Sequence, residues 1–361
     1  MPNVESSRIR TLDGWRGIAI LAVMVDHAAT YTRYNDLLLT NLGSFGVDIF
    51  FVLSGYIITL RFLEERKKTS TLSLPEFYAR RAFRILPLVI VYLSTLCIFS
   101  LFVNLEDFHS KEILGSLFFF RNYQYASNPS GIYTTHFWSL SIEEHFYLLW
   151  PSLLLWLGNR RALWLTIAGA FSCAVWRAYY LAHSGSWLGQ LFPGVAGVLW
   201  RTDTRFDGLL LGSATAIVLS LPSARNFIFR NFPKETPLMA GLLIILNLVR
   251  TTGMPTSSTY LLVCLALAST LVIEEGLVHK WLNLRVLVWI GTISYSIYVW
   301  QQMFFFHPSM NVHPLGILGS LPLSIVCVIG VSALSFYFVE KPCIAFGKRM
   351  LVKHKDSSVH F

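Results

Sequence analysis

Apolar residues run in long stretches along almost the whole chain, with short polar interruptions between them. Besides the ten long stretches given at the end of this paragraph, a shorter apolar run at 113–122 is more typical of a re-entrant or interfacial segment. The pattern predicts an all-α integral membrane protein with about ten transmembrane helices in one bundle. These helices are expected at 17–32, 45–61, 85–103, 136–157, 162–181, 206–221, 237–250, 259–275, 286–306 and 316–338.

The composition supports a membrane class. Of the 361 residues, 54% are apolar and 14% are charged, whereas soluble domains have about 25% charged residues. We expect one membrane domain at 1–345 and a short basic cytoplasmic tail at 346–361, with no appended soluble domain. The first apolar stretch follows basic residues as in a signal peptide, but it contains Asp26 and His27 and lacks a cleavage site. It is therefore expected to be a retained span.

The positive charges predict an orientation. A ten-span topology places 22 of the 29 Lys and Arg residues on the side of the two termini and 7 on the other side. The positive-inside rule then predicts cytoplasmic N- and C-termini in the plasma (inner) membrane. The net charge of +9 is divided among the loops, so no nucleic-acid partner is expected. The five cysteines are scattered without a CxxC pair, and neither a disulfide framework nor a metal site is predicted.

Several acidic residues lie in or beside the predicted spans. A charge at the centre of a span costs roughly 2.5–3.5 kcal/mol, and such groups usually pair or face a polar cavity. Contact between helices, or snorkelling of the side chain at the end of a span, is the alternative role for any one of them. Taken together, they predict a functional site. The residues are Asp26, Asp48, Glu143, Glu144 and Asp207.

Arg16 and His27 are in register on the first predicted helix. Their spacing of eleven residues comes within roughly 20° of three full turns and corresponds to a rise of about 16 Å. Both side chains should therefore share a face, with Arg16 at the cytoplasmic entrance and His27 near mid-depth. The cation suits an anionic group and the imidazole suits proton transfer. A packing role is the alternative for His27.

The segment "FYARRAFRILP" at 77–87 contains a pair of arginines, Arg81 and Arg84, at i and i+3. Two guanidiniums on one helical face repel each other unless an anion bridges them. Such a pair offers bidentate recognition of phosphate. An ordinary positive-inside anchor that also touches anionic lipid is the alternative.

The segment "HFWSLSIEEHFYLLWP" at 136–151 brings two adjacent carboxylates into a span. Consecutive helical positions diverge by about 100°, so only one of Glu143 and Glu144 can face a given cavity squarely. A carboxylate is the usual orienting partner of a catalytic imidazole. In "GVDIFFVLSGYI", Ser54 is not in a nucleophile elbow, so a hydrogen bond to a neighbouring helix is its expected role.

The motifs together resemble acyltransferase family 3, the multi-span O-acyltransferases typified by bacterial O-antigen and exopolysaccharide O-acetylases. Seven motifs in the family's order make the resemblance specific. They are "RIRTLDGWRGIAILAVMVDH" with the Arg-x10-His pair Arg16 and His27, "GVDIFFVLSGYII", "ARRAFRILP", "WSLSIEEHFYLLWP", "TRFDGLLLG", "ISYSIYVW" and "EKP" at 340–342.

The resemblance implies ten core helices, a cytoplasmic acyl-CoA donor and an acceptor hydroxyl on the far side or within the membrane. Acetyl is the acyl group expected by family frequency. The chain departs from the family pattern at three places, with Gly291-Thr292 where Gly-Arg is common, Gln301 where His is common and His145 where Gln is usual.

The resulting hypothesis is an O-acyltransferase that moves an acyl group, by default acetyl, from acyl-CoA to a hydroxyl of a glycan, glycolipid or other sugar-containing acceptor. His27 is the predicted general base, with Glu144 or Glu143 orienting it. Transfer is direct, with acyl-CoA as cosubstrate and no permanently bound cofactor. Arg16, Arg81, Arg84 and Arg80 are the predicted donor-binding residues. Supporting or acceptor-binding roles are predicted for Asp48, Ser54, Asp26, Trp138, Arg205 and Asp207.

Two other classes remain open at this point. A proton-coupled transporter also needs buried Asp, Glu and His residues, but it more often shows paired repeats with broken helices, which this sequence lacks. A transporter would also give the pair Arg81 and Arg84 no evident function. A structural or lipid-scrambling protein is the second alternative, and it predicts no binding of acyl-CoA.

Overall fold

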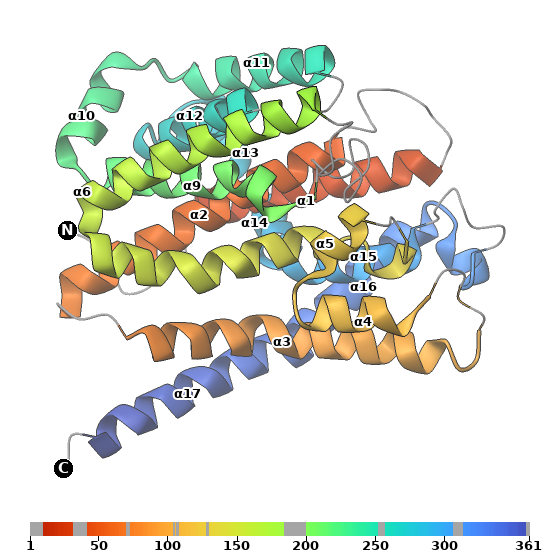
Figure 1. Ribbon diagram of the computed structural model, residues 1–361. Coiled ribbons are helices and arrows are strands. Elements are labelled where there is room, and N and C mark those ends of the chain that lie inside the picture. Colours follow the sequence, from red (N-terminus) through yellow and green to blue (C-terminus); the bar gives the residue numbers. More distant parts are fainter. Residues whose placement is uncertain are drawn as a thin grey trace.

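The computed structural model describes residues 10–31, 42–69, 73–103, 105, 108–127, 130–183, 200–251, 257–305 and 313–358. Helices make up every regular element in this part of the chain, so the all-α prediction is confirmed (Figure 1). The helices are α1 (Arg10–Tyr31), α2 (Leu42–Thr69), α3 (Leu74–Phe99), α4 (Ser110–Leu117), α5 (Arg121–Ser127), η2 (Ile132–Thr134), α6 (Phe137–Ala182), α9 (Thr202–Leu219), α10 (Pro222–Asn231), α11 (Thr236–Thr251), α12 (Ser257–Val272), α13 (Leu277–Leu282), α14 (Arg285–Thr292), α15 (Ser294–Phe304), η3 (Gly316–Gly319), α16 (Leu323–Ser335), η4 (Phe336–Glu340) and α17 (Lys341–Ser358).

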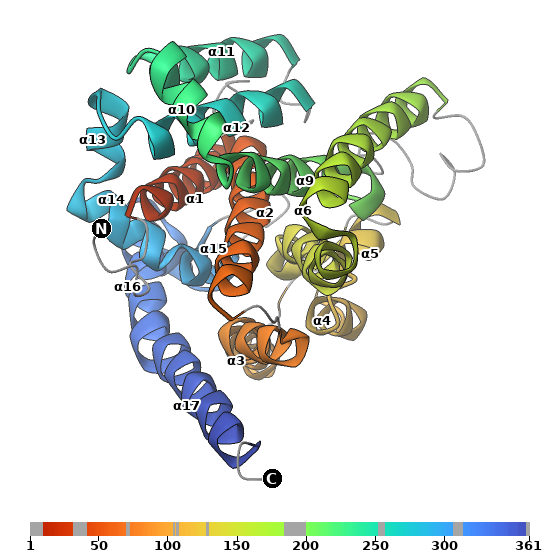
Figure 2. The ribbon, with the colours of Figure 1, turned by 90° about the vertical axis from the view of Figure 1, so that its left-hand side faces the viewer.

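The long helices lie roughly parallel or antiparallel in one bundle (Figure 1). Seen along the bundle, α1 and α2 occupy the middle, with α11 and α12 on one side and α3 on the other (Figure 2). The most extensive helix contacts join α9 to both α2 and α6, and α1 to both α2 and α14. Helix α1 begins and α17 ends at the same end of the bundle (Figure 1).

Each of the ten predicted apolar segments contains helix, but four of them differ in detail. The segments 136–157 and 162–181 are the two arms of α6, which reverses direction at Gly158, a residue with a positive φ of 68°. The segment 286–306 is divided into α14 and α15, which meet at Ile293. The segment 316–338 begins with the short η3 and continues through the π-helix η4 into α17.

Local chemistry explains where α3 begins. Ser73 is the N-cap residue, and its hydroxyl accepts a hydrogen bond from the backbone N–H of Glu76 at 3.3 Å. Pro75 occupies the first turn, where a missing N–H costs nothing, and the carboxylate of Glu76 favours the positive end of the helix dipole. These signals fix the turn that precedes the arginine pair.

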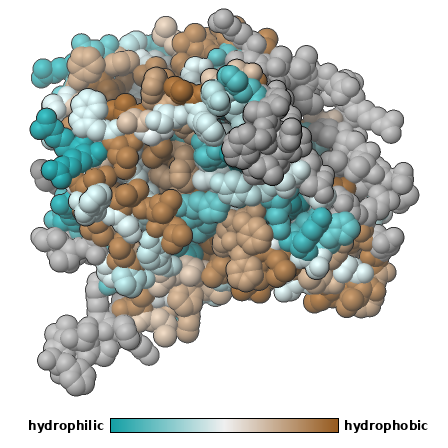
Figure 3. Space-filling model, in the orientation of Figure 1, coloured by the Kyte–Doolittle hydropathy of each residue, from teal (hydrophilic) through white to brown (hydrophobic). Residues whose placement is uncertain are grey.

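Three helices of the described chain are long and apolar enough to cross a membrane: Leu42–Lys68, Leu74–Phe99 and Leu323–Leu351. Helices α9 and α10 give a fourth span if they are counted together, although they are bent by 94°. Helix α1 does not reach this hydropathy, because Arg16, Asp26 and His27 lie within it. Hydrophobic side chains cover much of the surface in Figure 3, and hydrophilic ones gather along its left margin.

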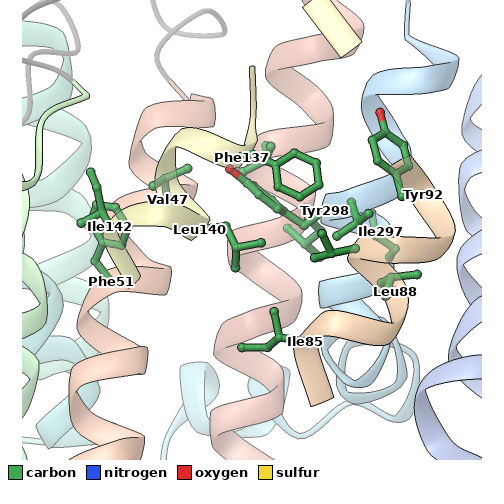
Figure 4. Close-up of a cluster of buried hydrophobic side chains, with 14 of the residues drawn as sticks. Val47, Phe51, Ile85, Leu88, Tyr92, Phe137, Leu140, Ile142, Ile297 and Tyr298 are labelled. Carbon is green, nitrogen blue, oxygen red and sulfur yellow. The ribbon is translucent and has the colours of Figure 1, made fainter. Parts of the chain in front are cut away.

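Helices α2 and α9 approach each other closely through glycine. A Cβ atom on Gly55 would lie 1.9 Å from the carbonyl oxygen of Leu209, and one on Gly212 would lie 2.0 Å from that of Val52. Small residues allow such contacts between membrane helices. The larger side chains of α2, α3, α6 and α15 meet in the hydrophobic core of Figure 4, which holds Val47, Phe51, Ile85, Leu88, Tyr92, Phe137, Leu140, Ile142, Ile297 and Tyr298.

Candidate functional site

A pocket opens among α1, α2, α3, α6 and α15, and we call it the arginine pocket. It encloses about 700 Å³ of space between atoms, part of which is open to solvent. Three guanidiniums, one carboxylate and several hydroxyl groups give it polar walls. Its lining residues are Arg16, Val47, Phe50, Leu53, Ser54, Arg81, Arg84, Ile85, Ser139, Leu140, Glu143, Tyr147, Ser294, Tyr295 and Tyr298.

The structure brings together the predicted donor-binding residues Arg16, Arg81 and Arg84. Arg16 Nη1 lies 3.4 Å from the carboxylate of Asp13, one turn earlier on α1. The guanidinium of Arg81 lies over the ring of Tyr147, 3.5 Å from its centroid. Such cation–π contact holds the guanidinium while leaving its N–H groups available to an anion.

Glu143 is the carboxylate of this pocket. It accepts hydrogen bonds from the Ser54 hydroxyl at 3.1 Å and from the Tyr147 hydroxyl at 2.5 Å, both at the same oxygen. The positive charges of Arg81 and Arg16 also act on it. Ser54 therefore has the role expected of it, a hydrogen bond to a neighbouring helix.

His27 lies on α1 with Arg16, in line with the predicted shared helix, but it is outside the set of pocket-lining residues. Its ring packs against Phe305, with centroids 6.2 Å apart. His136, a buried imidazole that the sequence analysis did not select, lies within the electrostatic influence of His27. The hydrogen bonds of Glu143 go to Ser54 and Tyr147, and none joins it to His27 among the described contacts.

Two further predicted site residues, Glu144 and Arg80, are not among the residues that line the arginine pocket. Glu144 is partly buried and lies within the electrostatic influence of Arg81 and Glu143. Its Oε1 oxygen has no hydrogen-bond partner in the described chain. Arg80 points to two carboxylates, at 3.1 Å from both Glu65 and Glu76, and it is not a lining residue of the arginine pocket.

The remaining predicted residues form buried contacts outside the pocket. Asp48 and Arg205 make an ion pair at 2.7 Å, with side chains only 2% and 1% exposed. The Arg205 guanidinium also lies 5.5 Å from the Trp138 ring. Asp207 pairs with Arg177 at 2.7 Å.

These groups satisfy one another within the protein. Ser257 also donates a hydrogen bond to Asp207, at 2.9 Å. Asp26, on α1, packs against Gly43 at the start of α2.

Sequence reasoning missed the tyrosines of the pocket, Tyr147, Tyr295 and Tyr298. The hydroxyl of Tyr295 donates to the carbonyl of Ile85 at 2.9 Å, and that of Tyr298 lies 2.5 Å from Ser139 Oγ. The spacing of Glu143 and Tyr147, i and i+4 on one helix, was the available signal for the first of them. The motif "ISYSIYVW" contained the other two.

The chemistry of the arrangement follows from these contacts. Three guanidiniums around one cavity suit a ligand with several negative charges, such as a phosphorylated one. In the described ranges, no group of three His, Cys, Asp or Glu side chains could hold a metal ion.

Comparisons with known proteins agree with the resemblance seen in the motifs. A family model described as an acyltransferase domain matches residues 9–340. The peptidoglycan O-acetyltransferase OatA of Listeria monocytogenes is 28% identical over 92% of this chain and 55% of its own length. A protein of Staphylococcus aureus named "Putative O-acetyltransferase" is 29% identical over 92% of this chain and 56% of its own.

A third relative, named "Putative peptidoglycan O-acetyltransferase YrhL" in Bacillus subtilis, is 27% identical over 94% of this chain and 55% of its own. The chain thus spans about half the length of the curated relatives it matches. No solved structure gives a significant match.

Proposed function

The chain belongs to the acyltransferase family, and we propose that it is a membrane O-acyltransferase that moves an acetyl group from acyl-CoA to a hydroxyl of a glycan. The observation that carries the proposal is the arginine pocket, in which Arg16, Arg81 and Arg84 surround one cavity. The names of the relatives, which state O-acetyl transfer, support acetyl as the group that moves.

In this proposal the three arginines bind the phosphates of coenzyme A. Arg81 and Arg84 lie on α3 (Leu74–Phe99) and Arg16 lies on α1 (Arg10–Tyr31), so all three belong to the N-terminal halves of their helices. A phosphate there gains hydrogen bonds from guanidinium N–H groups. The pantetheine arm of the donor then extends between the helices toward the middle of the bundle.

His27 is the proposed general base. It takes the proton of the acceptor hydroxyl while the oxygen attacks the thioester carbonyl, the carbon–sulfur bond breaks, and the proton is passed to the departing thiolate. The base lies eleven residues beyond Arg16 on α1, about 16 Å along the helix axis. The extended pantetheine arm of coenzyme A has a similar length and can cover that distance. The carboxylates of Glu143 and Glu144 are proposed to supply negative charge near the thioester.

The proposed topology has ten spans in the plasma (inner) membrane, with both termini in the cytoplasm. The distribution of Lys and Arg supports it, since 22 of 29 lie on the side of the termini. In this orientation the arginine pocket faces cytoplasmic acyl-CoA. A proton-coupled transporter is not favoured, because the matching family is described as an acyltransferase domain.

Peptidoglycan is the acceptor that the names of two relatives support. The test is to supply membranes containing this chain with radiolabelled acetyl-CoA and isolated peptidoglycan, and to count label in the glycan. Mass analysis of the cell's glycans with and without the gene should show the loss of one acetyl increment per modified sugar. No transfer to any glycan, with proton-driven uptake into vesicles instead, would contradict the proposed function.

A further inference from the structure

Two sequence motifs far apart in the chain, "ISYSIYVW" and "EKP", meet in the structure beside the arginine pocket. Ser296 on α15 donates a hydrogen bond to a carboxylate oxygen of Glu340. Both side chains are buried, with exposed fractions of 0% and 3%. These two residues are 44 positions apart, each lies within a motif, and neither lines the arginine pocket. Their contact therefore has no role yet assigned to it.

Glu340 is the last residue of the π-helix η4, which joins α16 to α17 without a break. π-helical turns are rare and occur frequently at functional sites, because they displace one side chain from the regular helical array. Helix η4 packs against α3, the helix that carries the arginine pair. The irregular turn thus presents a carboxylate on the side of the bundle where Arg81 and Arg84 lie.

The neighbour of Ser296 connects the same helix to the pocket. Tyr295 lines the arginine pocket, and its hydroxyl donates to the carbonyl of Ile85 at 2.9 Å. Ile85 directly follows Arg84. Two successive residues of α15 therefore hold, on one side, the backbone next to Arg84 and, on the other side, Glu340.

Electrostatics completes the connection between Glu340 and the arginine pair. The positive charge of Arg84 acts on the Glu340 carboxylate. A carboxylate buried to this degree is costly unless hydrogen bonds and an opposite charge compensate it. Ser296 supplies a hydrogen bond to the Glu340 carboxylate, and the charge of Arg84 favours its ionised form.

We propose that Glu340 is a positioning residue for donor binding, which holds the guanidinium of Arg84 toward the arginine pocket through the Ser296 and Tyr295 contacts. This inference rests on the proposed function, because it assigns the phosphates of acyl-CoA to that pocket. The carboxylate acts through Arg84 and does not touch the donor.

The test measures the Kd of acetyl-CoA for the full-length protein in detergent, in a double-mutant cycle of Glu340→Gln and Arg84→Ala. Each single change should weaken binding about tenfold, or about 1.4 kcal/mol. The double variant should bind no more than twofold worse than Arg84→Ala alone, since Glu340 acts through that arginine. Glu340→Asp keeps the charge and should stay within about threefold of the wild type.

Glu112→Gln is the matched control. Glu112 is also a buried carboxylate, 1% exposed, that accepts a hydrogen bond from a serine, Ser130, at 2.8 Å, and it lies outside the pocket lining. Its variant should lose thermal stability but keep the acetyl-CoA Kd within about twofold of the wild type, because no pocket arginine depends on it.

The outcomes separate this inference from the proposed function. Wild-type affinity in Glu340→Gln, or additive losses in the double variant, would overturn the positioning role and leave the donor site intact. A wild-type protein that does not bind acetyl-CoA would overturn both. Should Glu340→Gln fail to fold, Ser296→Ala replaces it. A two- to threefold loss of affinity is expected there, and unchanged affinity would contradict the inference.

Discussion

Two regions of this protein place guanidiniums inside the helical bundle, and they use them differently. At the contact of α2 and α9, Arg205 is 1% exposed and lies 2.7 Å from the carboxylate of Asp48. In the arginine pocket, Arg16 keeps 20% of its side chain exposed, and Arg81 lies over a tyrosine ring. The first pair is closed within the protein, whereas the second group faces a cavity. Partners and access, rather than residue type, distinguish an arginine that is paired within the protein from one that faces a cavity.

The largest expected effect concerns the proposed chemistry. His27→Ala should lower the rate of acetyl transfer by about 10² to 10⁴, the usual contribution of a general base. Transfer of labelled acetyl from acetyl-CoA in membranes measures it, at equal protein content. His183→Ala, which removes an exposed imidazole at the end of α6, is the control and should transfer at the wild-type rate. Full activity in His27→Ala would remove this residue from the mechanism.

The closed pair should respond in stability. Arg205→Ala leaves the Asp48 charge buried without its ion-pair partner, and about 3–5 kcal/mol of the free energy of unfolding should be lost. Thermal unfolding in detergent measures the loss. Arg80→Ala breaks pairs whose arginine is 37% exposed, and it should cost at most about 1 kcal/mol. Equal losses of stability in the two variants would show that a buried ion pair contributes no more to stability than a partly exposed one.

The open group should respond in binding. Arg81→Ala should weaken acetyl-CoA binding by about ten- to a hundredfold, because a hydrogen bond to a charged group contributes roughly 1.5–3 kcal/mol. Its melting temperature should remain close to that of the wild type. If the Kd did not change while the protein became less stable, Arg81 would belong with Arg205 as a structural residue.

The smallest effect distinguishes the two functions of Tyr147. Tyr147→Phe keeps the ring beneath Arg81 but removes the hydroxyl that donates to Glu143, at a cost of roughly 0.5–1.5 kcal/mol in stability. The acetyl-CoA Kd should stay the same. Tyr147→Leu also removes the ring, and it should weaken acetyl-CoA binding severalfold through the lost cation–π contact. Identical binding by the two variants would mean that the ring does not position Arg81.

Hydropathy predicted the helices well, because each buried or membrane-facing helix must be apolar over most of its length. It did not predict the break at Ile293, since the residues on both sides of it are equally apolar. Helix α17 extends to Ser358, into the segment 346–361 that was predicted as a basic tail with no secondary structure assigned to it. A basic, polar segment gives no hydropathy signal for a helix that extends beyond the apolar region.

The site was predictable in part. Arg16, Arg81, Arg84, Ser54 and Glu143 were selected because charged and polar groups are conspicuous in apolar segments, and the structure gathers them around one cavity. The pocket tyrosines could not be selected in that way, because an aromatic residue in an apolar helix usually belongs to the core. Pairing was also hidden, since Asp48 and Arg205 are 157 positions apart and only the folded chain brings them together.

Five helices line the arginine pocket, and their lining residues extend along the chain from residue 16 to residue 298. A ribosome must therefore synthesise more than four-fifths of the 361 residues before α15 can close the cavity. A nascent chain that ends before α15 has the three arginines but lacks the part of the lining that Ser294, Tyr295 and Tyr298 supply. The complete pocket thus exists only after α15, the last of its five helices in chain order, has been made.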